Sequence, residues 1–185
     1  MREIEAKILE VNTPRLVKKL KALGAKKNLD EKVTAFFYDF PGRKLHNQKS
    51  MLRLRKKGKI VELTFKKRVS KAKAKISEEI EVNVPDFSRT QKILESIGLR
   101  LEKISKKHRL SYNIEKTHFE FDTFKGIPTF LEIEAPSEKV LEKYVKLLGF
   151  KASDAKAWTG KEVLDYYANK AKPETKKQIL KNSKI

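Results

Sequence analysis

Hydrophobic and polar residues alternate along much of the chain with a period of two, the pattern of a β-strand that buries one face. Eight segments show this alternation together with many β-branched and aromatic residues. We expect strands at residues 2–11, 32–40, 51–57, 59–68, 75–84, 104–114, 118–124 and 129–135. The connections between several of them are short, with turns at Gly58 and at Gly126-Ile127-Pro128, and therefore predict antiparallel pairing.

Four other segments repeat apolar residues every three or four positions and are expected to form amphipathic helices. The first covers residues 13–23, with Thr13 as N-cap, and the second covers 87–97. The third follows Ser137, and the fourth begins near Ser153 and includes Trp158. The pattern ends after residue 170, so we predict one domain at 1–170 and a basic, mobile tail at 171–185.

The polar faces of seven predicted strands carry ionised side chains of both signs. In the first strand Glu3, Glu5 and Lys7 share one face, because alternate side chains point the same way. Like charges also stand side by side as Glu3/Glu5, Arg53/Arg55, Glu79/Glu81 and Glu132/Glu134. The two like charges within a doublet repel each other. Such pairs are typical of side chains that together bind a metal ion or a phosphate. The alternative is a half-open sheet with a solvated charged face and no ligand.

Closure of this sheet into a barrel would place the charged faces inside. An eight-stranded barrel has room for side chains or for one small ligand. Ionised groups in such a space must be hydrated, paired or bound to ions. Carboxylates bind hard divalent cations, and arginine and lysine bind phosphate oxygens. The pattern therefore predicts a compact polyanion with its metal ions as the ligand.

Composition narrows the class of protein. The 185 residues are 39% hydrophobic, which is enough for one sizeable domain. There is no apolar run that could span a membrane and no signal-peptide pattern, so we expect a cytoplasmic protein without a membrane partner. The absence of cysteine excludes disulfides and thiolate metal sites.

The net charge of +20 attracts polyanions, and a basic stretch between Lys66 and Lys75 and the basic tail add to it locally. A nucleic-acid-binding module without catalysis is therefore a competing hypothesis. It is less favoured, because the acidic doublets would repel nucleic acid. A solvated loop and tail is the simpler interpretation of the basic segments.

The ordered motifs of the chain resemble those of the CYTH superfamily, the triphosphate tunnel metalloenzymes. The first motif of that family, Glu-x-Glu-x-Lys, stands here as Glu3-Ile4-Glu5-Ala6-Lys7. The later motifs follow in the expected order as Leu52-Arg53-Leu54-Arg55, Leu63-Thr64-Phe65-Lys66, Glu78-Glu79-Ile80-Glu81, Lys107-His108-Arg109, Asp122 and Leu131-Glu132-Ile133-Glu134. Lys161 lies where the family often shows Lys-Ser-Tyr, but Glu162-Val163 follows it here, which leaves its role open.

The resemblance implies an α+β fold, in which an eight-stranded antiparallel closed β-barrel forms a tunnel with a charged lumen, flanked by helices. It implies two divalent metal ions, Mg²⁺ or Mn²⁺, per site. It assigns catalysis to Glu3, Glu5 and Lys7. It assigns substrate binding to Lys7, Arg53, Arg55, Lys66, Arg109 and Lys161. It assigns metal binding to Glu3, Glu5, Glu79, Glu81, Asp122, Glu132 and Glu134.

These expectations together favour a metal-dependent triphosphatase acting on inorganic triphosphate. A class IV adenylyl cyclase that forms cyclic AMP from ATP, or a thiamine triphosphatase with Trp158 as a stacking residue, would use the same tunnel. No Gly-rich Walker loop is present. The sequence leaves open the preferred substrate, the choice between Mg²⁺ and Mn²⁺, and whether the protein forms a homodimer.

Overall fold

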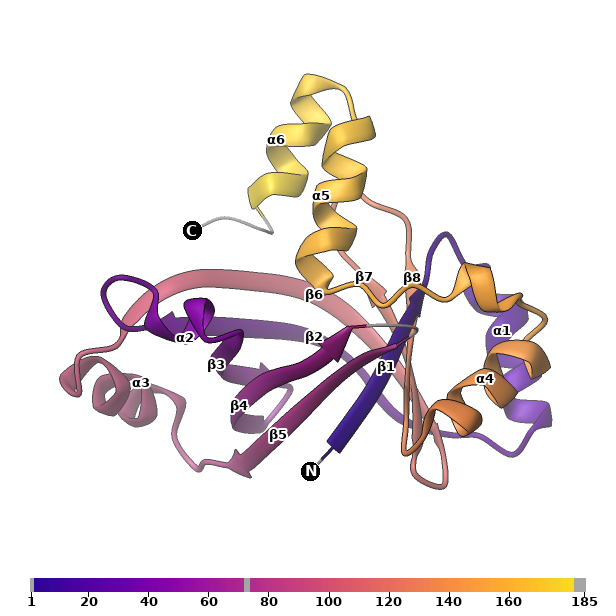
Figure 1. The fold of residues 1–185 in the computed structure, drawn as a ribbon, viewed down its shortest axis with the longest axis horizontal. Helices are drawn as coiled ribbons and strands as arrows, with labels where there is room; N and C mark the ends of the chain where they lie inside the picture. The colour runs from indigo at the N-terminus through magenta and orange to yellow at the C-terminus, as the bar shows by residue number, and fades with distance from the viewer. Residues whose placement is uncertain (1, 72–73, 182–185) are drawn as a thin grey trace.

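Eight antiparallel strands close into a barrel in the computed structural model, which describes residues 2–71 and 74–181 (Figure 1). Around the barrel the strand order is β1-β5-β4-β3-β2-β6-β7-β8. The strands are β1 (Arg2–Ile8), β2 (Lys26–Asp39), β3 (Ser50–Lys57), β4 (Ile60–Lys71), β5 (Lys75–Asn83), β6 (Arg100–Ile114), β7 (Thr117–Thr123) and β8 (Phe130–Ala135). The predicted α+β fold with a closed barrel is confirmed.

Strands β2 and β6 are longer than the sequence pattern predicts. They pair with each other from Lys26–Asn113 to Asp39–Arg100, with register shifts after Lys27 and after Phe37. The early part of β2 is a polar run without alternation, so local pattern alone did not indicate a strand there. Its strand conformation follows from pairing with β6, a contact between segments far apart in sequence.

In the described part of the chain six helices flank the barrel: α1 (Thr13–Ala22), α2 (Lys44–Asn47), α3 (Phe87–Ser96), α4 (Glu138–Leu147), α5 (Gly160–Lys170) and α6 (Pro173–Lys181). Asn12, not Thr13, caps α1, because its side chain accepts a hydrogen bond from the Arg15 amide at 3.0 Å. The predicted fourth helix is also corrected. A short 3₁₀ turn at Ala152–Asp154 comes first, and α5 begins only at Gly160, so Trp158 precedes the helix.

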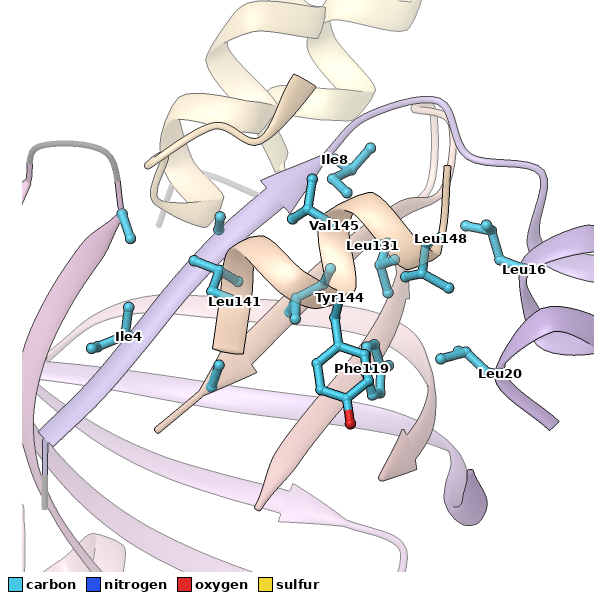
Figure 2. Close-up of a cluster of buried hydrophobic side chains, with 14 of the residues drawn as sticks. Ile4, Ile8, Leu16, Leu20, Phe119, Leu131, Leu141, Tyr144, Val145 and Leu148 are labelled. Carbon is cyan, nitrogen blue, oxygen red and sulfur yellow. The ribbon is translucent and has the colours of Figure 1, made fainter. Parts of the chain in front are cut away.

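The hydrophobic core lies outside the barrel wall. Ile4 and Ile8 of β1 point away from the barrel interior and are 6% and 2% exposed. Leu141 and Val145 of α4 pack over this outer face (Figure 2). Because the helices bury the apolar faces of the strands, the charged faces are left to line the interior.

The segment after residue 170, where the sequence predicts no further element, contains α6. Ile179 of α6 is 1% exposed and belongs to a cluster with Phe124 and Leu164. Gly126 allows this packing, since a Cβ there would lie 3.1 Å from Ile179 and its φ is +94°. The predicted basic tail therefore forms a packed helix as far as Lys181, and its last four residues lie outside the described part. None of the helices in the described ranges has the length and apolarity of a membrane span.

Candidate active site

A cavity of about 1360 Å³ occupies the barrel interior. Side chains from all eight strands and the first turn of α5 line it. Every residue that the sequence analysis assigned to the site is among them. The alternation of side chains along the strands thus brings the predicted acids and bases into one space.

Lys7 forms the centre of one ion-pair group. Its Nζ lies 2.7 Å from an oxygen of Glu5 and 2.6 Å from an oxygen of Glu132, which faces it across the β1–β8 pair. Burial opposes the charged form, but the carboxylates of Glu132 and Glu5 raise the pKa of Lys7 above its ordinary value. Lys75 Nζ lies 2.8 Å from the same oxygen of Glu5. Glu5 is therefore held between two ammonium groups.

Lys66 organises a second group beside the first. Its Nζ lies 2.6 Å from Glu3 and 2.8 Å from Glu79. Burial alone would raise the pKa of Glu3, yet the nearby Lys66 ammonium and a hydrogen bond with Glu134 lower it to about 2. Glu3 is thus ionised across the neutral range.

The two arginines of β3 face this group. Arg55 lies 2.7 Å from Glu62 and 3.3 Å from Glu81. Arg53 donates a hydrogen bond to the Thr64 hydroxyl at 3.3 Å but makes only long ion-pair contacts, 4.0 Å to Glu79 and 3.9 Å to Glu81. Its Nε is buried without a hydrogen-bond partner. Burial and the neighbouring Arg55 lower the pKa of Arg53 to about 10, so the side chain remains charged at neutral pH. Arg53 has donor capacity that an anionic ligand could use.

Arg109 of β6 completes the basic lining. Its Nε and one terminal nitrogen each lie 2.6 Å from the two oxygens of Asp122, a bidentate arrangement, and it also pairs with Glu120. Lys107 binds the same Asp122. Burial and the charge of Arg109 lower the pKa of Lys107 to about 8.

Two clusters of carboxylates could hold metal ions. Oxygens of Glu3, Glu5 and Glu134 lie within 4.8 Å of one another, and so do oxygens of Glu120, Glu132 and Glu134. Glu134 belongs to both clusters. Burial and the charges of Glu120, Glu3 and Glu132 raise the pKa of Glu134 well above its ordinary value. A hard divalent cation with oxygen ligands would relieve this repulsion, so the donor set fits Mg²⁺ or Mn²⁺.

Three predicted metal ligands lie outside these clusters. Glu79 pairs with Lys66, Glu81 with Arg55, and Asp122 with Arg109. Lys161 of α5 lines the cavity, but its side chain is 65% exposed and pairs with Asp165. The exposure of its side chain indicates that Lys161 lies at a mouth of the tunnel.

The structure adds residues that the site prediction omitted. Glu120 belongs to a carboxylate cluster and shares the inward face of β7 with Asp122, so strand alternation could have identified it. Lys75 stands at the first position of β5, at the end of a lysine-rich run. Nothing in that run distinguishes it from solvated lysines.

Two further residues of the sequence motifs and hypotheses lie outside the tunnel. His108 points away from the cavity, as alternation predicts, and its Nε2 lies 3.1 Å from Asp30. Trp158 lines a separate surface groove and packs against Tyr166 with ring centroids 5.3 Å apart. It is not part of the tunnel lining, which removes the support for stacking of a thiamine ring on Trp158.

Acid is expected to destabilise the fold through Glu3. Its pKa is 4.5 ordinarily and about 2 when folded, so its stabilising contribution is complete above about pH 4.5 and is lost as the pH falls through about 2. The difference corresponds to about 3 kcal/mol. Urea unfolding between about pH 5 and about pH 2 measures most of it. Glu3→Gln should flatten the dependence, whereas an unchanged slope in that variant would contradict this role.

Comparison with known proteins identifies the family. The CYTH domain family matches residues 1–154. A curated relative, "Putative adenylate cyclase MJ0240" of Methanocaldococcus jannaschii, is 27% identical over 157 residues, or 80% of this chain and 88% of the relative. The solved structure of PH1012 protein from Pyrococcus horikoshii shares the fold, with a TM-score of 0.70 and 24% identity over 85% of this chain and 96% of that one.

A further solved structure with this fold is that of "Putative adenylyl cyclase HpAC1" from Hippeastrum, which is described as revealing a dominant triphosphatase activity. Its structure has a TM-score of 0.60 and 18% identity over 92% of this chain and 98% of that one. At this identity the likeness shows the shared fold. The match of the family over most of the sequence, together with the closed barrel, shows that the chain belongs to the CYTH domain family.

Proposed function

We propose that the protein hydrolyses inorganic triphosphate to diphosphate and phosphate inside the tunnel, with divalent metal ions as cofactors. The observation that carries the proposal is the sharing of one cavity by two carboxylate clusters and a set of buried cations. A triphosphate with its metal ions presents the matching charges, with anionic oxygens for the cations and cations for the carboxylates. We assign residues 1–170 to this tunnel domain.

The basic residues would hold the phosphate groups. Arg53 and Arg55 approach the cavity from β3, and Arg109 approaches from β6. Lys66 and Lys7 add two ammonium groups on the side of β1. These cations now bind carboxylates, and the phosphate oxygens would take over part of those contacts. Lys161 at the mouth would contact the substrate on entry.

Glu3, Glu5 and Glu134 would hold one metal ion, and Glu120, Glu132 and Glu134 a second. Bound there, Mg²⁺ or Mn²⁺ would neutralise phosphate charge and lower the pKa of a coordinated water. Glu5, fixed by Lys7 and Lys75, would orient the attacking water in line with the terminal phosphorus. Glu79, Glu81 and Asp122 would position the phosphate-binding cations with which they pair.

Parallel assays with inorganic triphosphate, ATP and thiamine triphosphate test the proposal. We expect phosphate release with inorganic triphosphate to be fastest, a result in keeping with the triphosphatase activity described for HpAC1. The name of the M. jannaschii relative makes adenylyl cyclase the second candidate. Formation of cyclic AMP and diphosphate from ATP, without phosphate release from triphosphate, would show that the protein is an adenylyl cyclase and not a triphosphatase.

Divalent ions are expected to stabilise the substrate-free protein, because they relieve the repulsion at Glu134. At a metal concentration about a hundred times the Kd the gain is about 2.7 kcal/mol. Thermal unfolding with and without Mg²⁺ or Mn²⁺ measures it. Glu134→Gln should lose most of the gain, while Glu78→Gln, an exposed residue of β5, should keep it. Equal stabilisation of the two variants by the metal ion would contradict a metal site at Glu134.

A further inference from the structure

Most of the positive charge of the chain lies outside the tunnel. The cavity is lined by 14 lysines and arginines and by 11 aspartates and glutamates, a difference of +3. The whole chain carries +20, so the remaining residues carry +17. Binding of a small triphosphate in the tunnel does not require this outer charge.

Three exposed lysines form a patch on the outer face of β3, β2 and β6. Lys56 and Lys106 both stand opposite Thr34, one on each neighbouring strand, and Lys32 lies two positions from Thr34 along β2. Neighbouring strands are about 4.8 Å apart, so the three backbone positions fall within roughly 10 Å. His108 stands opposite Lys32 on β6, and its Nε2 contacts Asp30. We call Lys32, Lys56, Lys106 and His108 the outer basic patch.

The helices leave this part of the barrel wall open. In Figure 1, α2 and α3 lie towards one end of the long β2 and β6 strands, and α1 and α4 lie towards the other. The exposed carboxylate of Asp30, two positions before Lys32 on β2, is already engaged by Lys27 at 3.1 Å and by His108. Lys32, Lys56 and Lys106 are free to contact a ligand from solvent without rearrangement of the fold.

The structure also removes the main objection to a nucleic-acid partner. The acidic doublets, which would repel nucleic acid, face the tunnel and pair with its cations. They are separated from the outer basic patch by the barrel wall. An anionic chain on the outside of β2 therefore meets the lysines of the patch and not the acidic doublets. Among the described residues, the one outer carboxylate paired with the patch, that of Asp30, is already bound by Lys27 and His108.

We propose that the outer basic patch binds the phosphate backbone of nucleic acid. Lysines on adjacent strands can each contact a separate phosphate, and Thr34 between them offers a hydroxyl donor. A membrane surface fits less well, because β2, β3 and β6, the strands that carry the patch, have no exposed large hydrophobic side chain to enter the lipid interface. Base recognition is not part of the proposal, since phosphate contacts carry no sequence information.

Fluorescence anisotropy with a short labelled single-stranded RNA tests the patch. The variant Lys32→Gln/Lys56→Gln/Lys106→Gln should bind about tenfold more weakly or worse, and the slope of log K against log salt should fall by about 2 in magnitude. The matched control, Arg15→Gln/Lys18→Gln/Lys21→Gln, removes the same charge from the exposed face of α1. It should weaken binding clearly less.

Several results would overturn the proposal. Equal losses in the two triple variants would show that binding follows net charge and not the patch. Displacement of RNA by an excess of inorganic triphosphate would place the RNA in the tunnel. Binding of the wild type to phosphatidylserine vesicles but not to RNA would identify a membrane surface as the partner. The patch variant should still release phosphate from inorganic triphosphate. The test of RNA binding and the test of triphosphatase activity can therefore fail independently of each other.

Discussion

Replacing Glu5 by glutamine is expected to lower phosphate release from inorganic triphosphate by about a hundredfold or more. Glu5 is 4% exposed, contributes to a carboxylate cluster and is held by both Lys7 and Lys75. The amide keeps the size of the side chain but removes the negative charge that a metal ion and an attacking water require. Initial rates at saturating triphosphate and metal measure the loss.

The control for this prediction is Glu78→Gln. Glu78 lies on β5 but is exposed, and it does not line the tunnel. Its variant should hydrolyse triphosphate at the wild-type rate. If Glu5→Gln is as active as Glu78→Gln, Glu5 has no part in the reaction.

Replacing Arg109 by methionine is expected to cost about 3–5 kcal/mol of unfolding free energy. Arg109 is 4% exposed and neutralises Asp122 through two hydrogen bonds, and it also pairs with Glu120. Without it, Lys107 is the one cation among the described residues that still pairs with Asp122, and buried carboxylates are left too close together. Urea unfolding at neutral pH measures the loss.

The double variant Arg109→Met/Asp122→Leu provides the internal control. It removes the carboxylate that the single variant leaves uncompensated, and should therefore recover part of the lost stability. Lys106→Met, a neighbouring exposed cation on the outer face of β6, should change stability little. A loss of less than about 1 kcal/mol for Arg109→Met would show that the pair with Asp122 is not an important part of the folded state.

The sequence predicts the strands well where alternation is regular. In β1 and β8 the apolar residues Ile4, Ile8 and Ile133 face the helices, and the acids between them face the tunnel, as a period of two requires. The start of β2 was missed because its polar residues carry no such period. Its conformation depends on β6, and pairing at long range leaves no mark in the local sequence.

The composition of the candidate site could be predicted, but not the way in which its charges pair. Alternation places Glu79 and Glu132 in the tunnel, and the structure confirms that both line it. It does not predict that Glu79 pairs with Lys66 outside the carboxylate clusters, whereas Glu132 pairs with Lys7 and also belongs to a cluster. That difference depends on barrel closure and stagger, which bring β1, β7 and β8 together.

The helix at the C-terminal end shows a different limit. Residues 173–181 contain mostly lysines and polar residues, so their pattern indicates little buried surface. Ile179, the one fully buried residue among those described in this helix, packs beside Gly126, and the partly buried Leu180 packs against the same cluster. A single buried residue gives too weak a periodicity to predict an element.

The most direct test of the central claim is phosphate release from inorganic triphosphate by the wild-type protein as Mg²⁺ or Mn²⁺ is added and then removed with a chelator. The account predicts release that requires the metal, stops with the chelator and returns when metal is restored. Release that continues at the same rate in the chelator, or no release at any metal concentration, would contradict a metal-dependent triphosphatase in this tunnel.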